Sequence, residues 1–97
     1  MWVLIVRPEA ELDLSEAYSW YEQQRPGLGD DFLLRIEAAF DSILYDPHTC
    51  ACIFQDIRRK LIRHFPYGIF YIIAENKIIV LAVMHAKRNP SRWQDRK

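Results

Sequence analysis

The sequence predicts an α+β domain in which a hairpin of two helices packs on one face of a four-stranded, mostly antiparallel sheet. Three observations support this fold class. A short apolar run opens the chain, apolar residues then recur with a helical period to about residue 47, and from about residue 52 the chain changes to extended apolar runs. Because 97 residues allow a single core, residues 1–97 are expected to form one domain.

The first half predicts one strand and two helices. Residues 2–7 are mostly apolar and β-branched, as expected of a strand. Pro8 suits the first turn of a helix, where its missing N–H costs nothing, and residues 24–27 carry the signals that end this helix. The apolar positions between them recur on one helical face: Ala10, Leu14, Ala17 and Tyr21. A second helix is expected from about Asp30, a candidate N-cap, to Pro47.

The second half predicts three strands and a tail. Residues 57–65 mix basic and apolar residues, residues 66–68 interrupt the run, and residues 69–74 resume it as a strand. After a short turn, residues 78–84 form a strand that is apolar on both faces, which indicates an interior position with both sides covered. The tail leaves the sheet, and a short helical turn is expected after Pro90. The order is strand, helix, helix, strand, strand, strand.

Charge is divided between the two halves, although the 13 basic and 13 acidic residues cancel. Residues 1–56 carry three basic against eleven acidic side chains, a net of −8, and residues 57–97 carry ten against two, a net of +8. Such asymmetry indicates an anionic partner for the basic half, either nucleic acid or an acidic protein segment, with solvated surface charge as the alternative. The basic residues form two clusters: Arg58, Arg59, Lys60 and Arg63, then Lys87, Arg88, Arg92, Arg96 and Lys97.

Composition excludes several classes of protein. A hydrophobic content of 51% is too high for a disordered tail, and no apolar run approaches the roughly 20 residues that cross a bilayer. The apolar N-terminus lacks a basic leader and reaches Arg7 at once, so a strand is predicted there rather than a signal peptide, and a cytoplasmic location is expected. The spacing of His48, Cys50 and Cys52 could offer metal ligands, but no fourth ligand is evident. No metal and no cofactor are therefore predicted.

Over nearly its whole length, the chain resembles the RelE/ParE superfamily of type II toxin–antitoxin toxins, and within it ParE-like, plasmid-stabilisation toxins. Residues 8–17 resemble the first helix of that family, and residues 26–39 resemble its inter-helix turn and second helix. Three further segments resemble its strand motifs: Ile57-Arg58-Arg59, the run from Phe65 to Tyr71, and the run from Val80 to Trp93 with Ala82, His85, Arg88 and Pro90. The resemblance implies the family's small α+β fold.

The resemblance also implies two alternative activities. RelE-like members cut messenger RNA without a metal, so they need a proton acceptor, a proton donor and cations for the phosphorane. Arg88 matches the position of a phosphate-stabilising arginine in those members, and Arg58 and Lys60 lie roughly where they carry second-strand basic residues. Gly68 stands where their third strand has a catalytic arginine, and glycine cannot donate a charge-assisted hydrogen bond. His85 is the one remaining acid–base candidate, because its ordinary pKa suits either role.

These residues favour a ParE-like toxin that acts by binding, inhibits DNA gyrase, and is neutralised by a cognate antitoxin in a hetero-oligomer. An mRNA endonuclease, ribosome-dependent or free, remains the first alternative, with His85, Arg88, Arg63 and Lys60 as its candidates. The second alternative is an inactive toxin-fold protein that only binds its antitoxin. The residues expected to contact the target or the antitoxin come from both basic clusters: Arg58, Arg59, Lys60, Arg63, Lys87, Arg88, Arg92 and Trp93. Trp93 has an alternative role as an anchor of the tail on the sheet.

Overall fold

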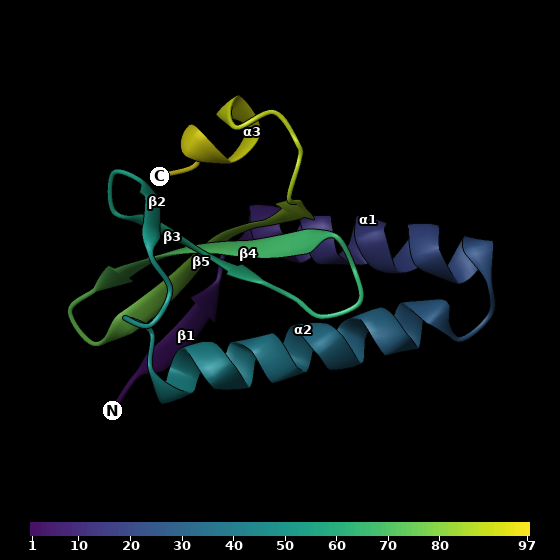
Figure 1. Ribbon diagram of the computed structural model, residues 1–97, viewed down its shortest axis with the longest axis horizontal. Coiled ribbons are helices and arrows are strands. Elements are labelled where there is room, and N and C mark those ends of the chain that lie inside the picture. Colours follow the sequence, from purple (N-terminus) through teal and green to yellow (C-terminus); the bar gives the residue numbers. More distant parts are fainter.

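The computed structural model describes residues 1–97 and has the predicted α+β architecture (Figure 1). Two long helices follow the first strand, four strands come next, and a short helix closes the chain. In chain order the elements are β1 (Val3–Val6), α1 (Pro8–Gln24), α2 (Leu28–Tyr45), β2 (Cys52–Phe54), β3 (Ile57–Leu61), β4 (Tyr67–Ala74), β5 (Lys77–His85) and α3 (Ser91–Gln94).

The five strands form one sheet in the order β1-β5-β4-β3-β2. All neighbours are antiparallel except β1, which pairs in parallel with β5. The register pairs Val3 with Lys77 and Val6 with Val80, so β1 covers only the first half of the edge of β5. The second half of that edge has no strand beside it and is therefore open.

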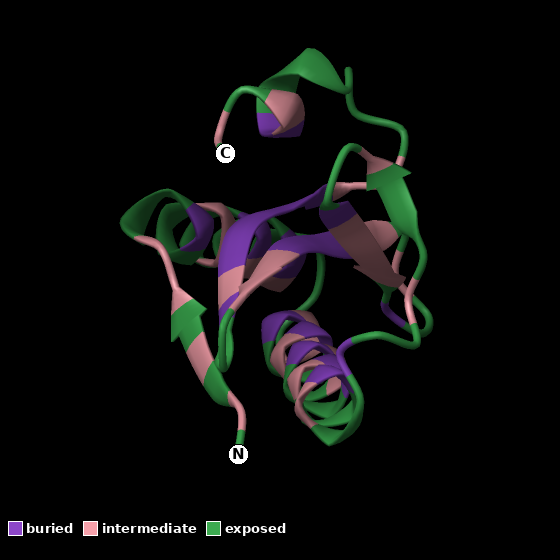
Figure 2. Ribbon diagram, turned by 90° about the vertical axis from the view of Figure 1, so that its left-hand side faces the viewer, coloured by how far each residue is buried: buried purple, intermediate pink, exposed green.

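Both faces of the sheet are covered, as predicted for β5 (Figure 2). On one face, α1 and α2 bury a core that includes Phe32 and Ile36 of α2 together with Ile69, Tyr71 and Val83 of the sheet. The opposite face carries a smaller apolar cluster, which α3 covers with one tryptophan: Ile57, Phe70, Leu81, Ala82, Met84 and Trp93. Burial of apolar area on both sides is the main stabilising contribution to such a layered domain.

The sheet has one strand more than the four predicted. β2 is only three residues long and pairs irregularly with β3, through Cys52 with Arg58 and Phe54 with Ile57. A run of this length shows no readable period, which explains why the sequence pattern missed it. The strand predicted over residues 57–65 ends at Leu61, and β4 starts at Tyr67 rather than after Gly68. His64 has a positive φ of 69°, which interrupts the extended chain between these strands.

Asp30 does not cap the second helix. α2 begins two residues earlier, at Leu28, because Gly27 adopts a left-handed φ of 91° that turns the chain sharply after α1. The Glu22 carboxylate of α1 accepts hydrogen bonds from the N–H groups of Gly27 and Gly29. A side chain of the preceding helix thus satisfies donors at the helix start that an N-cap normally satisfies. No helix of the protein is both long and apolar enough to cross a membrane.

Candidate functional site

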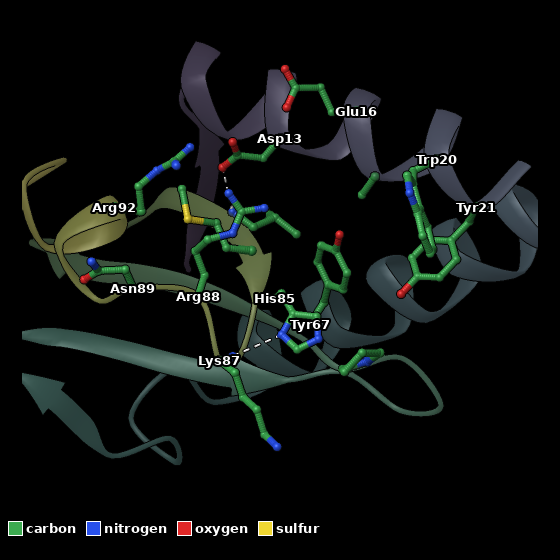
Figure 3. A pocket seen from close by; sticks show the side chains of 14 residues that line it. Asp13, Glu16, Trp20, Tyr21, Tyr67, His85, Lys87, Arg88, Asn89 and Arg92 are labelled. Carbon is green, nitrogen blue, oxygen red and sulfur yellow. Dashed lines mark hydrogen bonds between the residues drawn. The ribbon is translucent and has the colours of Figure 1, made fainter. Parts of the chain in front are cut away.

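The main pocket of the molecule lies between α1 and the end of β5 with the loop that follows it (Figure 3). Its volume is about 880 Å³, which is within the range of ligand-binding clefts. Helix α1 contributes one wall through side chains that include Asp13 and Trp20, and the tail that follows β5 contributes the opposite wall through Arg88 and Arg92. Tyr67 of β4 lines the pocket between them.

The pocket exists because β1 is too short to cover β5. The Arg7 N–H donates to the Val80 carbonyl at 3.1 Å, and the chain then turns into α1, which leaves the rest of that edge of β5 without a strand. Asp13 replaces part of the missing ladder, because its Oδ2 accepts the Val83 N–H at 3.0 Å. A buried edge of a sheet needs such partners, since each unpaired donor costs free energy.

Arg96 completes this edge from the end of the chain. Its guanidinium binds both carboxylate oxygens of Asp13, with an Nη2–Oδ1 distance of 3.2 Å, and also donates to the Leu81 carbonyl at 3.2 Å. The two side chains of this pair are only 21% and 12% exposed. The Arg7 side chain donates in turn to the Arg96 carbonyl at 2.7 Å. Asp13 in the pocket wall and Arg96 behind it are therefore structural residues, with their charges already paired.

Arg88 is the cation directed into the pocket. Its side chain extends toward α1, whereas the Lys87 side chain points away from the pocket and Arg92 extends from α3 (Figure 3). All three residues are exposed, and none of them forms an ion pair in the structure. An unpaired guanidinium with five donors at a pocket wall suits a carboxylate or phosphate group of a partner.

His85 and Tyr67 form the strand side of the pocket. They are paired in register across β5 and β4, and their ring centroids lie 5.9 Å apart. The His85 Nδ1 accepts the Lys87 N–H at 3.1 Å, so the neutral ring carries its proton on Nε2. Burial raises the pKa of the Tyr67 hydroxyl, and the nearby Arg88 partly opposes this shift. Tyr67 therefore stays neutral near pH 7 and can act as a hydrogen-bond donor.

An aromatic wall closes the end of the pocket near the turn between α1 and α2. Tyr21 packs edge-on against Tyr67 and Phe65, with ring centroids 5.9 and 4.8 Å away, and burial raises the pKa of its hydroxyl. Trp20 beside it is 55% exposed. A large apolar side chain left open at a pocket rim is typical of a contact surface. The pocket thus combines an apolar wall with the unpaired Arg88 and Arg92 and with neutral hydroxyl donors, a set that suits an acidic and apolar protein segment.

The basic residues of the other cluster lie outside this pocket. Arg58 donates through Nη1 to the carbonyls of Cys50 and His48, at 2.5 and 3.2 Å, and so fixes the loop that precedes β2. Lys60 pairs with Ile69 on the helix-covered face, while Arg59 pairs with Phe70 on the opposite face. Arg63 is exposed in the loop between β3 and β4. The endonuclease candidates His85 and Arg88 share a pocket, but Lys60 and Arg63 do not line it.

Gly68 and Trp93 belong to the sheet face that α3 covers. A side chain at position 68 would meet the Arg59 side chain, since a Cβ there would lie 3.0 Å from Arg59 Cγ. Trp93 is only 6% exposed and stacks on Phe70, with centroids 4.6 Å apart and planes at 20°. The expectation that Trp93 contacts a target is thus corrected in favour of its alternative role. Its ring packs on the apolar strand residues of that face and so removes them from water.

Sequence patterns missed part of the pocket. The sequence pattern placed Tyr21 on the apolar stripe of the first helix and Tyr67 in the interruption between two strands, and it marked neither Trp20 nor Asp13 as a site residue. One signal was available for Trp20, because it falls off the apolar stripe of α1 that contains Ala17 and Tyr21. No local signal marks Tyr67 or Asp13, whose place in the pocket depends on which strands are neighbours.

Comparisons with known proteins identify the family of the chain. Residues 4–90 match the family described as "ParE toxin of type II toxin-antitoxin system, parDE". The chain is 33% identical over 89 residues to "Toxin ParE2" of two Mycobacterium tuberculosis strains, CDC 1551 / Oshkosh and ATCC 25618 / H37Rv. That match covers 91% of this chain and 85% of each relative.

A solved structure has a similar fold. It is described as "Chromosomal ParDE TA system from P. aeruginosa", with a TM-score of 0.78 over 88% of this chain and 96% of that one, at 16% sequence identity. The fold and the family match define a toxin of the type II toxin–antitoxin class. More narrowly, the chain belongs to the ParE toxin family, since the match spans most of its length and the relatives share a third of its residues.

Proposed function

We propose that this protein is a ParE-like toxin that inhibits DNA gyrase and is neutralised by a cognate antitoxin, with both partners met in the cytoplasm. Membership of the ParE family is the observation that carries the proposal. The unpaired Arg88 in a pocket with an apolar wall supports binding of an acidic partner. Arg88 and Arg92, together with the half-buried Arg59 and Lys60 and the exposed Arg63, are the proposed contacts for the target or the antitoxin.

The antitoxin is proposed to be an acidic or amphipathic segment that folds as it wraps the toxin. The main pocket offers it an apolar wall at Trp20 and a cation at Arg88. The antitoxin gene is expected beside this one, usually upstream. Co-expression of the neighbouring small reading frame followed by affinity pull-down tests this part, and failure to recover a complex at moderate salt would count heavily against it.

Binding rather than catalysis is proposed as the mode of action. Cleavage of RNA needs an acid, a base and cations around one phosphate. Only His85 and Arg88 of the four endonuclease candidates line the pocket, and Gly68 replaces the catalytic arginine expected of an RNA-cutting relative. The shared pocket of His85 and Arg88 is still the observation that favours an mRNA endonuclease as the second candidate. A toxin-fold protein that only binds its antitoxin is the third.

Induction of the protein alone separates these candidates. For a gyrase inhibitor, we expect loss of DNA supercoiling, DNA-damage signalling and filamentation before any loss of transcripts, and purified protein that leaves RNA intact. Ribosome-dependent or free cleavage of a transcript by the purified protein would instead assign the endonuclease activity. Growth without any defect, from a protein that still binds its antitoxin, would assign the third function.

The substitution His85→Ala tests the catalytic alternative directly. A general acid or base typically contributes about 10²-fold or more to a rate, so an endonuclease should lose most of its toxicity with this change. Under the proposed function the variant stays close to the wild type in a growth-inhibition titration, provided that its melting temperature shows it to be folded. A folded but non-toxic His85→Ala protein would argue for catalysis.

A further inference from the structure

A second, smaller pocket of about 580 Å³ lies on the other side of the aromatic wall, next to α2. Its lining combines Leu28 and Leu34 of α2 with His64 and Phe65 of the loop between β3 and β4. Leu34 is 62% exposed, whereas Phe32, Ile36 and Ile43 of the same helix are buried. The pocket therefore presents an apolar centre to solvent.

The charge of this pocket differs from that of the helices around it. Residues 1–56 contain only three basic side chains, and two of them, Arg25 and Arg35, line this pocket. The one carboxylate there, Asp31, lies 3.8 Å from Arg25, in a pair whose side chains are both more than half exposed. Such an exposed pair contributes little and opens easily. Arg35 and His64 have no ion pair at all.

The two pockets adjoin at the loop between β3 and β4. Phe65 and Pro66 are consecutive residues, yet Phe65 lines the smaller pocket and Pro66 the larger one. Tyr21, which lines the larger pocket, packs on Phe65 at 4.8 Å and forms the ridge between them. A chain that lies in the larger pocket therefore reaches the smaller one by crossing this ridge, and it meets an unpaired arginine on each side: Arg88 first, then Arg35.

We infer that a single acidic partner segment occupies both pockets, placing one apolar side chain near Trp20 and a second against Leu34, with carboxylates facing Arg88 and Arg35. Charge complementarity commits the site to an acidic protein segment, because basic side chains outnumber carboxylates in the lining of each pocket, which also has an apolar centre. The apolar anchors distinguish such a segment from a simple polyanion. The inference rests on the proposed function and adds a second anchor pocket, on α2, to the antitoxin site.

Two substitutions test the smaller pocket without touching the larger one. The probe is the protein encoded by the neighbouring small reading frame, titrated onto the purified full chain by calorimetry or biolayer interferometry. Arg35→Glu and Leu34→Asp should each weaken binding by about tenfold, the scale of losing one charged or apolar anchor. Arg88→Glu should do the same from the larger pocket. Lys77→Glu, an equal charge change at the exposed first residue of β5, is the matched control and should bind like the wild type.

Shortening the probe shows whether one segment spans both pockets. A probe truncated until it no longer crosses the ridge should become insensitive to the changes in one pocket while it keeps its sensitivity to changes in the other. Because the two arginines lie in separate pockets, Arg35→Glu and Arg88→Glu should also weaken full-length binding additively. Melting temperatures of all variants confirm that they are folded.

The possible failures are distinct. If wild-type protein does not bind the neighbouring gene product, both the proposed function and this inference fall. If Arg88→Glu weakens binding while folded Arg35→Glu and Leu34→Asp proteins bind like the wild type, the proposed function stands and the second anchor is wrong. Binding of a synthetic RNA or DNA oligonucleotide that is abolished by Arg35→Glu, with the protein probe unaffected, would assign the smaller pocket to nucleic acid and overturn the inference.

Discussion

At the scale of single residues, the charged side chains divide into those with a partner and those without one. Arg58, Arg96 and Asp13 are engaged by carbonyls, an N–H group or each other. Arg88 carries the same charge as Arg96 only eight positions earlier, but it forms no ion pair. Because unpaired exposed charges contribute little to folding stability, the reason for such a residue is more often found in a partner.

Arg88→Ala is expected to abolish toxicity while leaving the melting temperature near that of the wild type. The side chain is exposed and unpaired, and surface substitutions of this kind usually change stability by less than about 0.5 kcal/mol. Growth inhibition after induction and a thermal melt of the purified protein are the two measurements. A folded Arg88→Ala protein with full toxicity would show that the basic tail is not the working surface.

The burial of Tyr71 leads to a prediction about the stability of the fold at alkaline pH. Its ring is fully buried, its hydroxyl donates to the Pro47 carbonyl at 2.7 Å, and burial raises its pKa above the ordinary 10.0. The neutral phenol is therefore favoured in the folded state, so its contribution to stability is complete below about pH 10 and is lost as the pH rises toward the folded-state pKa. The melting temperature should fall above pH 10.

The variant Tyr71→Phe isolates this contribution. It should start less stable, by about 1–3 kcal/mol, because the Pro47 carbonyl loses its partner, and it should then lose less stability than the wild type between pH 9 and pH 11. Tyr45→Phe is the control, since that ring is 92% exposed and should leave the alkaline profile unchanged. An equal alkaline loss in Tyr71→Phe and wild type would show that other groups cause it.

At the scale of elements, two elements of only four residues, β1 and α3, determine where the main pocket lies and how the second face of the sheet is covered. β1 has four residues, and its end at Val6 leaves the edge of β5 open for the main pocket. α3 also has four residues, too few to be stable alone, yet it covers the second face of the sheet through Trp93. Its position therefore depends on tertiary contacts, namely the stack of Trp93 on Phe70 and the bonds of Arg96 to the sheet edge.

Trp93→Ala should destabilise the whole domain. Removal of a buried tryptophan costs about 3–5 kcal/mol, and 1 kcal/mol corresponds to roughly 4–8 °C in a domain of this size, so the melting temperature should fall by more than about 10 °C. Toxicity should fall only as a consequence. Trp20→Ala is the matched control, because the 55% exposed Trp20 ring contributes far less to packing. A melting temperature unchanged by Trp93→Ala would mean that α3 is not part of the folded core.

At the scale of the whole molecule, the net charge of zero is the sum of an acidic region and a basic region. The helical layer of α1 and α2 contains most of the acidic residues, while the later strands, their loops and the tail contain most of the basic ones. The two pockets lie where these regions meet, with cations of the tail facing α1 and the few arginines of the hairpin facing the β3–β4 loop. A field of this kind steers an acidic partner toward the pockets before contact.

The association rate of the partner should therefore depend strongly on salt. Raising the salt concentration from about 50 mM to 500 mM shortens the Debye length severalfold, so the rate should fall by about tenfold or more while the dissociation rate changes less. Stopped-flow or biolayer interferometry with the neighbouring gene product gives both rates. An association rate that does not respond to salt would show that the separated charges play no part in recognition.

The sequence by itself determined the elements whose patterns are local. The helical period of residues 10–21, the doubly apolar run of residues 78–84 and the turn after Pro90 all correspond to observed elements, because side-chain burial on one or two faces imposes a readable period. The family followed from the order and spacing of short motifs along the chain, which the family match over residues 4–90 confirms.

Only the tertiary structure decided which charges are free. Asp13 and Arg96 are 83 positions apart and meet because β1 pairs in parallel with β5 and then ends, which brings the start of α1 to the same sheet edge as the chain's last residues. Arg88 faces the pocket at this open edge, whereas Trp93 is buried against Phe70 on the opposite face of the sheet. In the sequence, Arg88, Trp93 and Arg96 lie close together in the basic tail. In the folded chain, Trp93 and Arg96 have structural contacts and Arg88 is exposed, because these contacts depend on the order of the strands, which is a non-local property.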